Sequence, residues 1–130
     1  MERLYIDTEF TDFFSHDESK SGELIQLAAY PVVDGCPHGE PFTQLCKPLG
    51  HKWSEGAEKV HQISRLFAKG QQDPEIMMHN FINWLESLGD KYWHITTHNG
   101  GSDQSYMMRL LVKYNLLDRF QAITRPVWRC

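Results

Sequence analysis

Two carboxylates stand two positions apart near the N-terminus, at Asp7 and Glu9. They follow a short apolar and β-prone run over residues 3–6, and side chains two apart in a strand point to the same side. Two converging acids repel one another unless a cation neutralises them, and oxygen-rich sites suit Mg²⁺ or Mn²⁺. The pair therefore indicates a divalent-metal site, although such a triplet also arises by chance at a solvated strand end.

A third acid, Asp103, follows a β-prone segment over residues 92–97 at the point where helical spacing resumes. The helix dipole alone favours an acid in the first turn of a helix. In an open sheet whose first and fourth strands are neighbours, however, Asp103 would lie beside Asp7 and Glu9. Acids that hold two divalent ions can support phosphoryl displacement, because the ions stabilise the attacking and leaving oxygens.

The rest of the chain supplies the elements that must position these acids. Hydrophobic periodicity and turn residues predict further strands over residues 24–33, 42–46 and 121–127, and helices over residues 54–60, 76–88 and 106–114. Ser54 is the expected N-cap of the first helix, and Asp73 precedes Pro74 at the start of the second. The first three strands are expected to be antiparallel neighbours. This order predicts an α/β fold, a mixed five-stranded sheet with flanking helices.

Composition narrows the function classes. One hundred and thirty residues predict a single domain over residues 1–130, and 41% hydrophobic residues suffice for a core. A net charge of −4 argues against coating nucleic acid by bulk charge, so any such contact is expected to be local. Three cysteines without paired or metal-type spacing fit a reducing, cytoplasmic setting. No apolar run approaches the roughly 18 residues of a membrane span, so no membrane partner is expected.

Five short motifs, in order along nearly the whole chain, resemble the DEDD superfamily of 3′–5′ exonucleases. The resemblance is to the proofreading-subunit (DnaQ-like) type, which has an RNase H-like fold. The motifs are YIDTEFT at 5–11, ELIQLAA at 23–29, KP at 47–48, VHQIS at 60–64 and HNGGSD at 98–103. The resemblance implies a metal-dependent exonuclease that removes nucleotides from the 3′ end of single-stranded or 3′-terminal DNA or RNA by two-metal-ion hydrolysis.

The same resemblance implies roles for individual residues. Catalytic and metal-binding acids would be Asp7, Glu9 and Asp103, with Mg²⁺ or Mn²⁺ as cofactor. The backbone at Phe10 and Thr11 would help to seat the terminal nucleotide. Asn99 would orient the turn that presents the third acid.

The chain departs from the family pattern in two places. Ser102 stands where the family has an aromatic residue. The family's last motif, a general-base His or Tyr followed by a fourth acid in a C-terminal helix, has no counterpart, because Asp118 is the only acid after Asp103 and no His follows. The general base is therefore unknown, the C-terminal helix is missing, and a C-terminally truncated domain is expected. Without that helix, Trp128 would be exposed and the chain would self-associate.

An alternative function remains open: a catalytically impaired, exonuclease-like module that binds nucleic acid or a polymerase partner. Other candidates are weaker. His94 and His98 favour structural or turn roles over a zinc site, and His61 favours packing or capping. Exposed aromatic rings stack on bases, but core packing is the commoner role. The aromatic candidates are Phe13, Phe14 and Tyr106.

Overall fold

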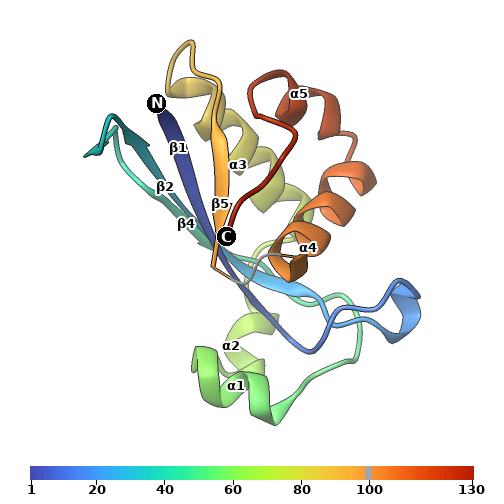
Figure 1. The fold of residues 1–130 in the computed structure, drawn as a ribbon. Helices are drawn as coiled ribbons and strands as arrows, with labels where there is room; N and C mark the ends of the chain where they lie inside the picture. The colour runs from blue at the N-terminus through green and yellow to red at the C-terminus, as the bar shows by residue number, and fades with distance from the viewer. Residues whose placement is uncertain (99–100) are drawn as a thin grey trace.

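The computed structural model describes residues 1–98 and 101–130 as a mixed β-sheet with helices packed on it (Figure 1). The strands are β1 (Glu2–Phe10), β2 (Leu24–Val33), β3 (Cys36–Pro37), β4 (Phe42–Leu45) and β5 (His94–Thr97). The helices are α1 (Glu55–His61), α2 (Arg65–Lys69), α3 (Pro74–Ser87), α4 (Gly101–Lys113) and α5 (Leu117–Ala122), with a 3₁₀ turn at Glu18–Lys20.

The central strand β1 pairs antiparallel with β2 on one side and parallel with β5 on the other. The two strands β3 and β4 both pair antiparallel with β2, so the main path of the sheet is β3-β2-β1-β5. This arrangement confirms the predicted antiparallel grouping of the first strands. It also confirms the α/β class and the mixed five-stranded sheet.

One face of the sheet carries the core. Along β1, Leu4, Ile6 and Thr8 are buried, whereas Tyr5 and Asp7 between them are exposed. The buried face packs against α3 and α4, whose inward side chains include Met77, Phe81, Ile82, Met107 and Leu111. Strand β1 is longer than the run over residues 3–6 that hydrophobicity predicts. The side chain of Thr8 is buried like those of Leu4 and Ile6, so the alternation of buried and exposed residues continues past Ile6. Asp7 and Glu9 therefore lie within the strand.

Local sequence signals place the turns and helix starts. Asp34 and Gly35 have φ of 51° and 81°, as a two-residue hairpin turn requires. The Ser54 hydroxyl accepts a hydrogen bond from the Ala57 N–H at 3.2 Å, which confirms the predicted N-cap. Asp73 precedes α3 without capping it, since its carboxylate pairs with the Lys47 ammonium at 2.9 Å.

The sequence predictions were wrong for two segments, residues 65–69 and residues 121–127. Helix α2, capped by Ser64, was missed, and it has only five residues. The strand predicted over 121–127 is wrong, because α5 occupies residues up to Ala122 and buries Phe120 in the core. Beyond α5 the chain runs beside β5 through isolated bridges, Trp93 with Thr124 and Thr96 with Arg129.

The end of the chain therefore lies along an edge of the sheet without forming a continuous strand. Pro126 interrupts this segment and has no N–H to donate to a ladder. Trp128, expected to be exposed, is half-buried instead, because its ring packs 6.0 Å from the ring of Phe120. Among the helices described, none has the length and apolar character to cross a membrane.

Candidate functional site

The three predicted acids lie on two elements that meet at one end of the sheet. Asp7 and Glu9 are on β1, and Asp103 is in the first turn of α4. Asp103 is completely buried, and the buried hydroxyl of Thr8 donates a hydrogen bond to its carboxylate. The residue between the two strand acids thus connects β1 to the third acid.

Electrostatic coupling shows that the three carboxylates share one neighbourhood. Burial raises the pKa of the Glu9 carboxyl group above its ordinary value, and the negative charges of Asp7 and Asp103 raise it further. Within residues 1–98 and 101–130, however, no three acidic, histidine or cysteine side chains are gathered closely enough to hold a metal ion. The structure brings the acids near one another without forming a complete ligand set.

A cleft of about 490 Å³ opens beside these acids, and we call it the acid cleft. One wall comes from β1 and the loop that follows it, and the other comes from α1 and the residue that caps it. The lining residues are Asp7, Thr8, Glu9, Phe10, Asp12, Phe13, Ser54, Gly56, Ala57, Val60, His61 and His98.

Thr11, predicted to contact substrate through its backbone, is fully buried and makes hydrogen bonds within the protein. Its N–H donates to the Glu23 carbonyl at 2.8 Å, and its carbonyl accepts from the Ser54 N–H at 2.7 Å. Its hydroxyl accepts from the Glu23 N–H at 2.9 Å. Thr11 therefore ties the start of α1 to the sheet, while Phe10 lines the acid cleft. Asn99, the remaining predicted residue, lies outside the described residues.

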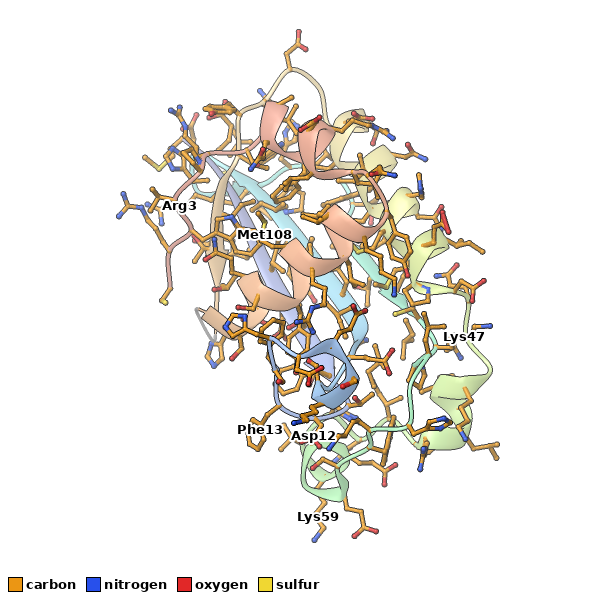
Figure 2. The ribbon with its side chains drawn as sticks, turned by 90° about the vertical axis from the view of Figure 1, so that its right-hand side faces the viewer. Arg3, Asp12, Phe13, Lys47, Lys59 and Met108 are labelled. Carbon is orange, nitrogen blue, oxygen red and sulfur yellow. The ribbon has the colours of Figure 1, made fainter. Side chains whose placement is uncertain are left out.

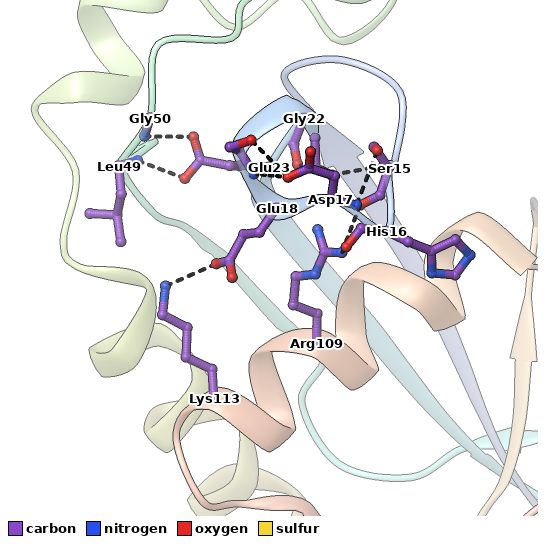
Figure 3. A network of polar contacts seen from close by, with 12 residues as sticks. Ser15, His16, Asp17, Glu18, Gly22, Glu23, Leu49, Gly50, Arg109 and Lys113 are labelled. Atoms are coloured by element: carbon purple, nitrogen blue, oxygen red, sulfur yellow. Dashed lines mark hydrogen bonds and ion pairs between the residues drawn. The ribbon is translucent and has the colours of Figure 1, made fainter.

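Helix α4 clamps the loop over residues 11–22 that follows β1. The Tyr106 hydroxyl donates to the Asp12 carbonyl. The Arg109 guanidinium donates to the Ser15 carbonyl at 2.6 Å (Figure 3). The same guanidinium lies 4.2 Å from the centre of the Phe14 ring. Burial raises the pKa of the Tyr106 hydroxyl, which keeps it a neutral donor. Tyr106 and Arg109 follow Asp103 by three and six positions, so one helix face holds both the acid and the loop.

The clamped loop presents an aromatic side chain at the acid cleft. Phe13 is 83% exposed, although its carbonyl accepts a hydrogen bond from the Gly22 N–H at 2.8 Å. A Cβ at Gly22 would lie 2.1 Å from the Asp12 carbonyl oxygen, so the two sides of the loop are in direct contact there. Figure 2 shows Asp12 and Phe13 at the same end of the molecule as Lys59 of α1. An exposed ring on a closely packed loop is suited to contact a ligand.

Two histidines also line the acid cleft. The Nδ1 atom of His61 accepts a hydrogen bond from the Ile63 N–H at 2.9 Å, so in the neutral ring Nε2 carries the proton. Burial lowers the pKa of His61, against the opposing effect of Glu58. Its Nε2 atom is buried without a hydrogen-bond partner among the described residues. His61 was predicted to have a packing role, and its ring does contact Trp53, but it also borders the cleft. His98 is exposed.

No protein-family model matches the chain, and no curated protein matches it in sequence. The fold, in contrast, is similar to solved exonuclease structures. Escherichia coli Exonuclease I in complex with a dT13 oligonucleotide superposes with a TM-score of 0.65 at 15% identity, over 86% of this chain and 24% of that chain. A product-bound structure of exonuclease I gives a TM-score of 0.66 at 15% identity, over 88% and 26% of the two chains. The metal-free E. coli ExoI–ssDNA complex gives 0.66 at 16% identity, over 86% and 24%.

These similarities establish the fold. The chain has the α/β, RNase H-like architecture that was predicted, and this architecture is similar to the fold of exonuclease I. It spans about a quarter of the length of the structures that it matches.

Proposed function

We propose that residues 1–130 form an exonuclease domain that removes nucleotides from the 3′ end of single-stranded nucleic acid with the help of divalent cations. One observation carries this proposal. On a fold similar to that of exonuclease I, burial and the negative charges of Asp7 and Asp103 raise the pKa of Glu9. Asp7 and Glu9 line an open cleft, and Asp103 is buried behind them. Such crowding favours the binding of a cation.

The donor set fits Mg²⁺ or Mn²⁺, because all three groups offer carboxylate oxygens. Asp7 and Glu9, which line the cleft, would hold the ion together with Asp103. When bound, the ion neutralises phosphate charge and makes water a better nucleophile. Thr8 contributes by fixing the Asp103 carboxylate through its hydroxyl. The chain would place the terminal phosphodiester at the cleft end of β1.

The cleft walls suit an unpaired terminal nucleotide. Phe13 and Val60 line the acid cleft, and they are 83% and 79% exposed. Apolar side chains that stand free in this way can contact a base only when its faces are not stacked in a duplex. Phe10 lies on the same wall as Phe13, and its ring stacks on that of Tyr106 at 5.0 Å. The arrangement supports a substrate with a single-stranded 3′ end.

The second candidate function is a module that binds nucleic acid without hydrolysing it. The lack of a complete metal-ligand cluster within residues 1–98 and 101–130 favours this alternative. The general base is also unassigned. Slow trimming is therefore expected, since general acid–base catalysis is typically worth about 10²–10⁴-fold.

The test is a trimming assay with Mn²⁺ on oligonucleotides labelled at the 5′ end, so that successive products are resolved by length. We expect a ladder of products that shorten from the 3′ end. The rate of trimming should fall at least about 100-fold in Asp7→Asn. Asp90→Asn, which removes an exposed acid outside the cleft, is the matched control. Binding without any Asp7-dependent trimming would support the second function instead.

A further inference from the structure

The face of the sheet opposite the core carries a pair of exposed aromatic rings. In the antiparallel register Tyr5 is directly opposite Tyr30, and the two side chains are 39% and 48% exposed. Directly opposite residues on paired strands project from the same face. The next pair toward one end is Arg3 with Val32, and the next toward the other end is Asp7 with Ala28. The tyrosines therefore stand between a cation and the first acid of the candidate site.

Three arginines from the two ends of the chain, Arg3, Arg125 and Arg129, lie at the cationic end of this face. Arg3 pairs with His94 in the parallel register of β1 and β5. Arg125 and Arg129 flank the same strand, since their N–H groups donate to the carbonyls of Trp93 and Ile95 at 2.8 and 2.9 Å. Figure 2 shows Arg3 projecting away from α3.

The charges of this cluster act on His94. Burial lowers the pKa of His94, and the positive charges of Arg125, Arg129 and Arg3 lower it further, against the opposing effect of Glu2. No carboxylate within residues 1–98 and 101–130 forms an ion pair with any of the three arginines. The guanidinium charges are therefore not neutralised by these carboxylates, and that of Arg125 lies 4.4 Å from the centre of the Tyr92 ring. The sequence alone does not predict this cluster, because its members are isolated charges along the chain.

A hollow of about 590 Å³ connects the tyrosines to the acid cleft. Tyr5, Tyr30, Thr96 and Cys130 line it, together with Asp7 and His98, which also line the acid cleft. Arg3 precedes Asp7 by four residues on the same strand face, a distance of about 13 Å at strand rise. Cations, aromatic rings and acids thus follow one another along a continuous surface.

We propose that this open face of the sheet is a binding track for a single-stranded polynucleotide, with bases on Tyr5 and Tyr30 and phosphates on Arg3, Arg125 and Arg129. Aromatic rings and guanidinium groups together match the alternating bases and phosphates of such a strand. The track rests on the proposed function only where it meets Asp7, at which point it would deliver the 3′ end. The binding itself requires neither metal nor hydrolysis.

The experiment measures the affinity of the whole chain for fluorescein-labelled dT12 and rU12 by anisotropy, in EDTA and over a series of salt concentrations. Arg3→Gln/Arg129→Gln is expected to weaken binding at least about 10-fold and to reduce the slope of log K against log salt by about 1.4, since each phosphate contact on a single strand contributes about 0.7. The charge-matched control is Lys20→Gln/Lys69→Gln, two exposed lysines on other elements, and it should change binding little.

The aromatic arm compares Tyr5→Ala/Tyr30→Ala with Tyr5→Phe/Tyr30→Phe. The alanine pair should lose at least about 10-fold in affinity, and the phenylalanine pair should retain it, because stacking needs only the ring. All affinities are measured in EDTA, where metal-dependent trimming cannot occur, so the track can stand even if no trimming is found with Mn²⁺. The dT12 and rU12 arms show whether the track takes DNA, RNA or both.

Unchanged affinity in the arginine pair, with native circular dichroism, would overturn the proposal. So would a dimer, detected by sedimentation, that Tyr5→Ala/Tyr30→Ala converts to monomer without affecting affinity for either oligonucleotide. The second result would assign this face to another copy of the chain.

Discussion

The hydroxyl of Thr8 donates a hydrogen bond to the carboxylate of Asp103, 95 residues further along the chain. Both residues are buried, and Asp103 is completely so. This contact joins the C-terminal part of β1 to the first turn of α4. It means that the strand bearing two of the candidate acids also positions the third.

Replacing Thr8 by Val should therefore destabilise the protein. The substitution keeps the shape of the side chain but removes the donor to a buried carboxylate, which typically costs about 1.5–3 kcal/mol. Urea denaturation of the metal-free protein measures the change. Thr43→Val on β4, where the side chain is exposed, is the matched control and should cost much less. Equal losses in the two variants would show that the Thr8 contact has no special role.

Asp7→Asn should have opposite effects with and without metal. Without metal, it removes a charge that disfavours ionised Glu9, so folding stability should be unchanged or higher. With Mn²⁺, calorimetry should show binding that is at least about 10-fold weaker than in the parent, because one carboxylate ligand is lost. Loss of the fold on this substitution would instead indicate a structural role for Asp7.

Glu9→Gln should increase stability at neutral pH but not in acid. The pKa of Glu9 is raised in the folded protein, so the folded state holds the proton more tightly than the unfolded chain. Parent stability therefore falls as pH rises from the ordinary glutamate value of 4.5 through the higher folded pKa. Thermal unfolding at pH 4 and pH 7, in EDTA, should show that the variant has a higher midpoint at pH 7 and about the same midpoint at pH 4.

Arg109→Met should loosen the loop over residues 11–22 without unfolding the sheet. The arginine holds the Ser15 carbonyl and covers the Phe14 ring, and Lys20 is an exposed trypsin site on the same loop. Cleavage after Lys20 should become at least about five-fold faster, because local opening governs proteolysis of such loops. Arg119→Met, which removes a surface pair with Glu86, should leave this cleavage unchanged.

Much of the fold could be predicted because the signals were local. The signals were the apolar run of β2, the hairpin turn at Asp34–Gly35, the Ser54 cap and Pro74 at the start of α3, and each acts within a few residues. The strand predicted over residues 121–127 was wrong because burial of Phe120 against the core favours a helix that continues to Ala122. Its β-prone residues provided no information about that long-range contact.

The candidate site was predictable to a similar degree. A spacing of two in a strand placed Asp7 and Glu9 together, and the first turn of α4 placed Asp103 nearby. The contacts of α4 with the loop over residues 11–22 could have been suspected, because Tyr106 and Arg109 lie on the same side of the helix as Asp103. The arginine cluster could not, because Arg3 and Arg129 meet only through the pairing of β1, β5 and the final segment.

Strand β1 pairs on one side with β2, the next strand in the sequence, and on the other side with the distant strand β5. These two pairings are expected to form in a definite order during folding. The contacts of β1 with β2, and of β2 with β4, close over short stretches of chain and can form early. The parallel contact with β5 must wait until about ninety intervening residues have been gathered, because closing a longer loop costs more entropy. Asp103 arrives with α4 directly after β5. A chain arrested before that step would have most of its sheet and two of the three acids but not Asp103, so completion of the candidate site depends on the slowest part of folding.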